Sequence, residues 1–208
     1  FPKAIADLAI AAHARHGNRM QGRALDLGCA TGRSSFELAR AFDKVIGIDF
    51  SALFIQVGAR LLETGTVRYT LPDEGELLNY YERRLDTLGL ADTASRVEFW
   101  QGDACNLKDA FSGFDLILAA NLIDRLYSPR RFLDTVAARL NPGGLLVLSS
   151  PYTWLEEYTK RSEWIGGYKK DGESYGTLDG LKEILGEKFT LVEGPESVPF
   201  VIRETRRK

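Results

Sequence analysis

Short apolar runs alternate with amphipathic segments along most of the chain, and this alternation predicts strands and helices in turn. Buried parallel strands show continuous apolar runs, whereas helices carry an apolar position every three to four residues. The predicted strands cover residues 23–27, 45–49, 97–103, 114–120 and 145–149. The predicted helices cover residues 4–15, 34–42 and 129–140, with a further helix from Ser51, a good N-cap residue. We therefore expect a doubly wound α/β fold, with a mostly parallel sheet and helices on both faces.

Two segments do not follow this alternation. Residues 67–95 contain a charged stretch, 74–88, which we interpret as helix-like, with Tyr80 and Tyr81 adjacent on it. This segment could serve the substrate or dock against other domains. Residues 151–175 place aromatic side chains among glycines and charges. Because loops at the carboxyl ends of parallel strands form the ligand crevice, we expect a substrate lid in this second segment.

The end of the chain favours strands again, over residues 189–193 and 198–203. They could form a closing hairpin, or be one strand of a hairpin whose partner is missing. A chain of 208 residues with 44% hydrophobic content can bury one sizeable core. We expect residues 1–208 to form a single domain, and the start at Phe1 suggests a piece of a longer multidomain enzyme.

Composition narrows the possible partners. A net charge of -2 provides no basic field, which argues against a nucleic-acid substrate. No apolar stretch approaches the roughly 20 residues of a membrane span. The two cysteines, Cys29 and Cys105, are too few for a disulfide framework or a zinc site, so cytoplasm is the default location. His13 and His16 have a helical spacing, but without a third ligand cluster we predict no metal.

The most informative motif is the turn that follows the first predicted strand. Gly28 and Gly32 let the backbone approach a ligand closely, and Asp49 ends the next strand about 20 residues on, where an acid suits a pair of ribose hydroxyls. The G-x-G-x-x-G of dinucleotide-binding dehydrogenases is absent, which disfavours an NAD-dependent enzyme. Asp26 instead adds a carboxylate where the cationic amine of a ligand could sit.

This motif resembles that of the class I S-adenosylmethionine (SAM)-dependent methyltransferases, in which an acid precedes three alternating glycines. Ala30 stands here in place of the middle glycine. The resemblance implies that Asp49 holds the ribose, that Asp103 binds the adenine amino group, and that Phe50 packs on the adenine. An ordinary turn that binds nothing is the alternative, but three loops agree in order and spacing. The expected cofactor-binding residues are Asp26, Gly28, Cys29, Ala30, Gly32, Asp49, Phe50, Ser51, Asp103, Ala104, Cys105 and Asn121.

A closer resemblance covers nearly the whole chain. Residues 121–126, 150–155 with 164–167, and 198–206 are similar to the methyltransferase domain of the ovothiol synthases. The resemblance implies methylation of the imidazole nitrogen Nπ of 5-thiohistidine, by direct displacement on SAM. Because the ring thiolate makes the imidazole electron-rich, a strong protein base is not demanded, and the protein mainly has to align the reacting atoms.

The amino acid end of such a substrate carries a carboxylate and an ammonium, which call for an arginine and an acid or carbonyl group in the pocket. For the charged candidates Asp124, Arg125 and Arg203, a surface or structural ion pair is the alternative. The same motifs would also suit a class I methyltransferase for another small N-, O- or S-nucleophile, or a SAM-binding module without activity. The candidate substrate-binding residues are Asn121, Asp124, Arg125, Tyr152, Trp154 and Arg203.

Overall fold

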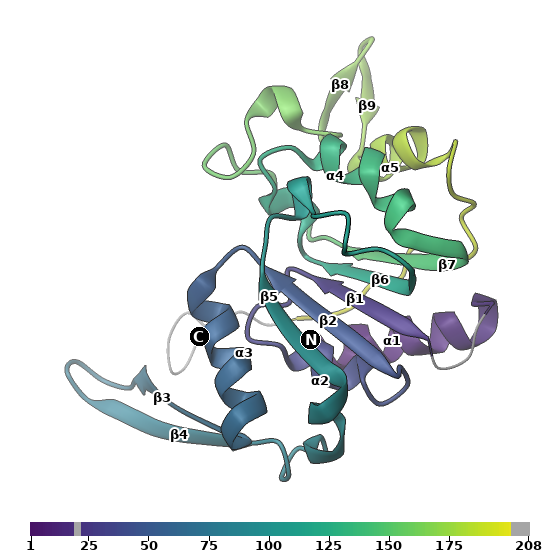
Figure 1. The fold of residues 1–208 in the computed structure, drawn as a ribbon. Helices are drawn as coiled ribbons and strands as arrows, with labels where there is room; N and C mark the ends of the chain where they lie inside the picture. Colours follow the sequence, from purple (N-terminus) through teal and green to yellow (C-terminus); the bar gives the residue numbers. More distant parts are fainter. Residues whose placement is uncertain (19–21, 201–208) are drawn as a thin grey trace.

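The computed structural model describes residues 1–18 and 22–200 and is built around a five-stranded parallel sheet (Figure 1). The strand order is β5-β2-β1-β6-β7, and every neighbouring pair is parallel. The strands are β1 (Arg23–Leu27), β2 (Lys44–Asp49), β5 (Val97–Gln101), β6 (Phe114–Ala120) and β7 (Leu140–Ser149). The predicted parallel α/β sheet is confirmed.

Helices cover both faces of the sheet, and each face has its own apolar core. On one face, Ala24 and Leu118 pack with residues of α1 (Pro2–His16), α2 (Arg33–Leu38) and α3 (Ala52–Thr64). On the other face, Leu25 and Ile117 pack with residues of α4 (Pro129–Val136) and α5 (Thr177–Leu185). Successive side chains of a strand point to opposite faces of the sheet, so neighbouring apolar residues pack into different cores.

The element bounds differ from the predicted ones mainly at helix ends. The helix predicted over 34–42 spans Arg33–Leu38, and the one predicted over 129–140 ends at Val136 in a single 3-10 turn, Ala137–Arg139. The strand predicted from Leu145 begins at Leu140, with a register shift opposite Phe114–Leu116. Helix α5 was not predicted. No strand covers residues 189–193, and residues 201–203 lie outside the described part.

The prediction of a helix-like stretch over 74–88 is wrong. This segment belongs to an antiparallel hairpin of β3 (Thr66–Pro72) and β4 (Leu78–Arg84), which projects from the main body (Figure 1). Tyr69 lies opposite Tyr81, and the two rings stack at 5.4 Å. Aromatic and β-branched residues favour strands, and cross-strand ring pairs stabilise them. The turn uses Gly75, whose φ of +55° suits glycine.

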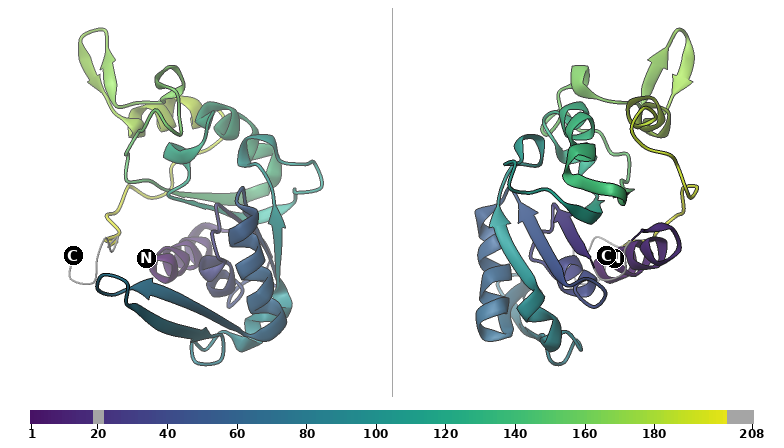
Figure 2. Two further views of the ribbon diagram at one scale, coloured as in Figure 1. Left: turned by 90° about the vertical axis from the view of Figure 1, so that its left-hand side faces the viewer. Right: turned by 45° about the vertical axis from the view of Figure 1, so that its right-hand side comes forward.

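A second hairpin lies within the segment expected to form a substrate lid. Strands β8 (Tyr168–Lys170) and β9 (Glu173–Tyr175) extend outward beside α5 (Figure 2). Asp171 and Gly172 both have positive φ, as a two-residue hairpin turn requires. Within residues 1–18 and 22–200, no helix has the length and apolar character needed to cross a membrane.

Candidate functional site

The carboxyl ends of β1, β2 and β5 are tied together by backbone hydrogen bonds. The N–H groups of Gly28 and Cys29 donate to the carbonyl oxygen of Ile48, at 2.8 and 3.2 Å. The N–H of Gly102 donates to the carbonyl oxygen of Asp49 at 3.0 Å. The three loops singled out in the sequence therefore meet at one edge of the sheet, as the parallel topology requires.

Asp49 is the centre of this arrangement. Its Oδ2 accepts a hydrogen bond from the N–H of Ala30 at 2.9 Å, and its Oδ1 accepts one from the N–H of Ser51 at 2.8 Å. Ala30 has a φ of +48°, the left-handed region that glycine prefers, so its conformation is held at some cost. Each carboxylate oxygen keeps further acceptor capacity, which is what a pair of ribose hydroxyls needs.

Asp26 lies behind this turn and is only 1% exposed. Its Oδ2 accepts hydrogen bonds from the hydroxyls of Ser34 and Ser35, both at 2.7 Å. Its Oδ1 is buried and has no hydrogen-bond partner among the described residues. Burial raises the pKa of Asp26 to about 6, the two serine hydroxyls lower it, and the nearby charge of Asp49 raises it. A cationic group would satisfy this unpaired oxygen.

We predict that Asp26→Asn makes the protein more stable at neutral pH. Between the ordinary pKa of 3.8 and the folded value of about 6, the native state binds more protons than the unfolded state. The free energy of unfolding therefore falls as the pH rises through this window, by on the order of 3 kcal/mol. Asparagine removes that loss, so urea unfolding should show the variant to be more stable by about 3 kcal/mol at pH 7.5 and equal to the wild type at pH 4. A less stable variant at pH 7.5 would contradict this account.

Asp103 closes the site at β5. Its Oδ1 accepts a hydrogen bond from the N–H of Cys105 at 2.8 Å, and its Oδ2 accepts one from the hydroxyl of Tyr127 at 2.9 Å. This hydrogen bond raises the pKa of Tyr127, which keeps the phenol protonated. Tyr127 could not be found from the sequence, because its separation of 24 residues from Asp103 gives no local signal. Phe50 is 76% exposed beside these loops and is available to a ligand.

The cysteines and histidines take structural places. Cys29 and Cys105 are free buried thiols, and burial raises the pKa of both, so neither is a ready nucleophile. His13 packs its ring on Phe42, whereas His16 pairs with Glu193. Across the described residues, no group of three potential ligands is arranged to hold a metal ion.

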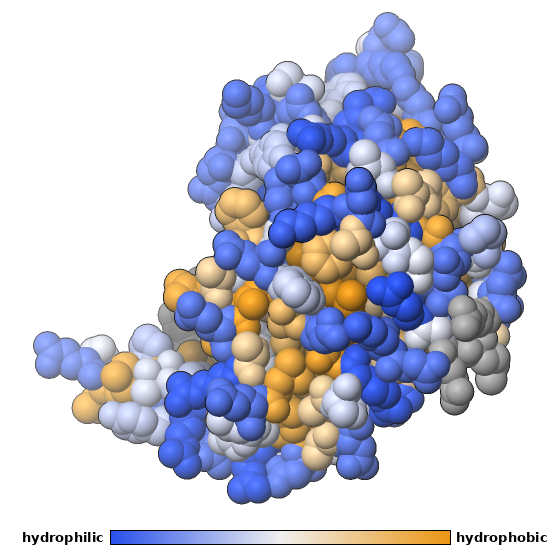
Figure 3. Space-filling model, in the orientation of Figure 1, coloured by the Kyte–Doolittle hydropathy of each residue, from blue (hydrophilic) through white to orange (hydrophobic). Residues whose placement is uncertain are grey.

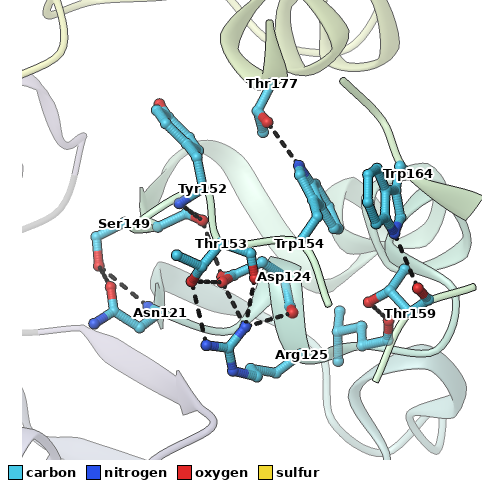
Figure 4. A network of polar contacts seen from close by, with 12 residues as sticks. Asn121, Asp124, Arg125, Ser149, Tyr152, Thr153, Trp154, Thr159, Trp164 and Thr177 are labelled. Atoms are coloured by element: carbon cyan, nitrogen blue, oxygen red, sulfur yellow. Dashed lines mark hydrogen bonds and ion pairs between the residues drawn. The ribbon is translucent and has the colours of Figure 1, made fainter. Parts of the chain in front are cut away.

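Asn121 follows β6 in the left-handed region, with a φ of +51°. Its N–H donates to the carbonyl oxygen of Ser149 at 2.8 Å, and its Oδ1 accepts from the Ser149 hydroxyl at 3.0 Å. The Nδ2 of the side-chain amide points away from the network drawn in Figure 4. Tyr152, after β7, also has a positive φ, of 56°, and its half-exposed ring stands clear of the network.

Asp124 and Arg125 are partners of one another and of the 150–155 segment (Figure 4). Asp124 is 0% exposed. Its Oδ1 accepts from the hydroxyl of Ser150 at 2.9 Å, and its Oδ2 accepts from Arg125 at 2.7 Å and Thr153 at 3.1 Å. Arg125 also donates to the carbonyl oxygen of Thr153 at 2.9 Å and lies over the ring of Tyr158. The structural pairing that the sequence left open is thus present.

The predicted lid is held by further side chains. Trp154 donates its indole N–H to the hydroxyl of Thr177 in α5 at 2.9 Å, and its ring stacks on Trp164 (Figure 4). Thr159 is buried and donates to the carbonyl oxygen of Leu126 at 2.6 Å. Trp154 therefore anchors the segment to α5, on the side of the Asp124 network away from Asn121. Arg203 lies outside the described residues.

The chain is similar to known proteins over most of its length. A sequence profile for a family described as "Methyltransferase domain" matches residues 3–185. The chain is 27% identical over 128 residues to a ubiquinone biosynthesis O-methyltransferase of Azorhizobium caulinodans, covering 62% of this chain and 40% of the relative. It is 29% identical over 126 residues to a demethylmenaquinone methyltransferase of Clavibacter sepedonicus, covering 61% of this chain and 40% of the relative. The matched parts span well under half the length of these curated relatives.

The fold is shared with solved structures. The crystal structure of a SAM-dependent methyltransferase from Clostridium acetobutylicum superposes with a TM-score of 0.53, at 17% identity. The superposition covers 82% of this chain and 58% of the other. The arrangement of strands and helices is therefore that of a Rossmann-like fold.

Proposed function

Because the chain belongs to the family of methyltransferase domains, we propose that it binds SAM at the carboxyl ends of β1, β2 and β5 and methylates a small-molecule acceptor. The observation that carries the proposal is the convergence of Asp26, Asp49 and Asp103 on one edge of the sheet, with acceptor capacity on each carboxylate. When bound, SAM supplies a methyl group bonded to a sulfonium sulfur, and the neutral thioether that remains is a good leaving group.

The residues present fit this cofactor. Asp49 is fixed by two backbone N–H groups and can accept from the ribose hydroxyls. The unpaired Oδ1 of Asp26 favours a nearby cation, which the ammonium of the methionine portion supplies. Phe50 can cover the adenine, and Tyr127 fixes the rotamer of Asp103, which can accept from the adenine amino group.

For the acceptor we propose 5-thiohistidine, methylated on its imidazole Nπ as in ovothiol biosynthesis. Two of the segments that resemble the ovothiol synthases, 121–126 and 150–155, lie together over the ends of β6 and β7. Asn121 and Tyr152 then contact the acceptor, whereas Asp124, Arg125 and Trp154 position them. The thiolated ring supplies its own electron density, so the residues here need only orient it and exclude water.

A second candidate acceptor is an apolar aromatic ring of the quinone type. Exposed apolar side chains stand at the end of β2 and the start of α3, beside the proposed cofactor site: Phe50, Leu53 and Phe54. Such a surface favours an apolar ligand. The names of the two curated relatives, which concern ubiquinone and menaquinone, agree with this candidate.

Turnover measurements distinguish the acceptors. The chain is incubated with SAM and, separately, 5-thiohistidine, histidine, a simple thiol and a demethylated quinone, and the methylated products are identified by mass spectrometry. We expect methylated 5-thiohistidine and a SAM affinity that falls by about 1–3 kcal/mol, or roughly 5- to 150-fold, in Asp49→Ala. If only the quinone were methylated, the proposal of 5-thiohistidine as the acceptor would be wrong. Unchanged affinity in Asp49→Ala would overturn the ribose placement, and binding without any product would indicate a module without activity.

A further inference from the structure

Arg125 lies between two residues that reach the proposed cofactor loops. Leu122, three residues before it, covers the glycine turn, since a Cβ added at Gly28 would lie 3.0 Å from the Cδ1 of Leu122. Tyr127, two residues after it, donates its hydroxyl to Asp103 at 2.9 Å. The chain at Arg125 therefore runs along the carboxyl edge of the sheet, beside the proposed cofactor site.

The guanidinium of Arg125 is held on one side only. Its Nη1 donates to the carbonyl oxygen and the Oδ2 of Asp124, at 2.8 and 2.7 Å, and to the carbonyl oxygen of Thr153 at 2.9 Å. Its Nη2 donates to the hydroxyl of Thr153 at 3.3 Å, and the ring of Tyr158 lies 4.9 Å from its Cζ. In Figure 4 the dashed lines leave the guanidinium on the side that faces Asp124 and Thr153. The group is thus fixed in place without using all of its donors.

The edge formed by Nε and Nη2 keeps free donors. Among the described residues, the Nε of Arg125 donates no hydrogen bond, and Nη2 uses only one of its two protons. The side chain is 36% exposed, so a ligand can reach this edge. Its two parallel N–H groups match the two oxygens of a carboxylate. Elsewhere in the chain, Arg15 binds both carboxylate oxygens of Glu193 through the same two nitrogen atoms.

From this geometry we propose that Arg125 binds the carboxylate of the acceptor through Nε and Nη2, and so selects an amino acid over an acceptor without a carboxylate. The inference rests on the proposed function, in which the acceptor is 5-thiohistidine. Only a few bonds separate the Nπ of this compound from its carboxylate, and Asn121, which also contacts the acceptor in that proposal, precedes Arg125 by only four residues. Because the guanidinium is already held, it loses little freedom on binding and fixes the orientation of the ring.

The surroundings of Arg125 agree with a charged acceptor. The carboxylate of Asp124 is also stabilised by the hydroxyls of Ser150 and Thr153, so Arg125 is not its only partner and can attract a second carboxylate. In Figure 3 the upper part of the molecule, which carries α4, β8 and β9, presents mostly hydrophilic residues, whereas apolar residues gather lower, over β5 and α3. A quinone ring has no carboxylate to pair with this edge of Arg125.

Two acceptors that differ only in the carboxylate test the proposal. 5-Thiohistidine is compared with 5-thiohistamine, which has the same ring and ammonium, and kcat/KM for methylation by SAM is measured for each. We expect the wild type to prefer 5-thiohistidine at least about tenfold, because the charge-assisted hydrogen bonds are lost with the carboxylate. Arg125→Met should methylate the two compounds without preference. Arg125→Lys keeps the charge but not the paired donors, so its preference should be intermediate.

Thr153→Val is the matched control, because it removes one hydrogen bond to Arg125 and leaves the edge formed by Nε and Nη2 intact. Its preference should equal that of the wild type. Each variant is its own reference, since a loss of folded protein lowers both rates and leaves their ratio unchanged. A wild type that methylates both compounds equally well, or an Arg125→Met variant that keeps the preference, would overturn the proposal while the proposed function stands. If neither compound is methylated, the proposed acceptor is wrong, and the role of Arg125 fails with it.

Discussion

Replacing Gly32 by alanine is expected to lower the free energy of unfolding by about 3 kcal/mol or more, and to disrupt the cofactor turn. Gly32 has a φ of +92°, which costs an alanine about 1–2 kcal/mol. An added Cβ would lie 2.2 Å from the Cζ of Phe99, and overpacking of this kind costs about 1–3 kcal/mol. Urea unfolding measures the stability loss, and calorimetry with SAM measures the loss of binding.

Gly65 supplies a matched control for Gly32. It also has a positive φ, of 68°, but an added Cβ would meet no atom within 4 Å. Gly65→Ala should therefore cost only the backbone term, about 1–2 kcal/mol, and leave SAM binding unchanged. The double variant Gly32→Ala with Phe99→Ala should lose less stability than the sum of the losses of the two single variants, because the clash is then absent. A Gly32→Ala loss no larger than that of Gly65→Ala would show that Phe99 yields.

Phe99 also explains glycines that the sequence left without a reason. Gly47 lies inside β2 and Gly58 inside α3, positions where glycine weakens the element. An added Cβ would lie 2.7 Å from the Phe99 ring at Gly47 and 2.9 Å from it at Gly58. The sequence indicates only a ligand-binding role for Gly32, because the turn that contains it is a local pattern. Its packing role comes from a strand more than 60 residues away and has no sequence period.

The sheet and the proposed cofactor edge could be predicted because their signals are local. Each buried strand is an apolar run, and each loop begins where its run ends, so topology alone brings Gly28, Asp49 and Asp103 together. The hairpin was missed for the opposite reason. Much of both faces of this hairpin is exposed to solvent, so its strands lack a clear alternation of apolar and polar residues. The charged run Glu82, Arg83 and Arg84 hides the pattern further, and the pairing of Tyr69 with Tyr81 is visible only in the structure.

The sequence singled out candidate acceptor residues, but it could not predict the contacts that these residues make with one another. Asp124 and Ser150 are 26 residues apart and meet because β6 and β7 are neighbours in the sheet. Nothing in the sequence indicates that both carboxylate oxygens of Asp124 accept hydrogen bonds from other residues of the protein. The same holds for Trp154, whose partner Thr177 lies on the unpredicted helix α5.

Asp124→Ala is expected to be among the most damaging single changes, costing about 3–5 kcal/mol of stability. It removes a buried carboxylate that accepts from Arg125, Ser150 and Thr153, and it leaves those donors without their acceptor. Because the 150–155 segment is attached through these bonds, the position of Tyr152 should also change, and turnover should fall together with stability.

The matched variants for Asp124 separate charge from contact. Thr153→Val removes one hydroxyl from the network and should cost about 1 kcal/mol. Arg125→Met combined with Asp124→Ala should recover part of the loss, because the guanidinium is then no longer left without its counter-charge. If Asp124→Ala unfolds in urea within about 1 kcal/mol of the wild type, the network does not hold the segment. In that case a loss of turnover alone would place Asp124 on the acceptor, as the sequence first suggested.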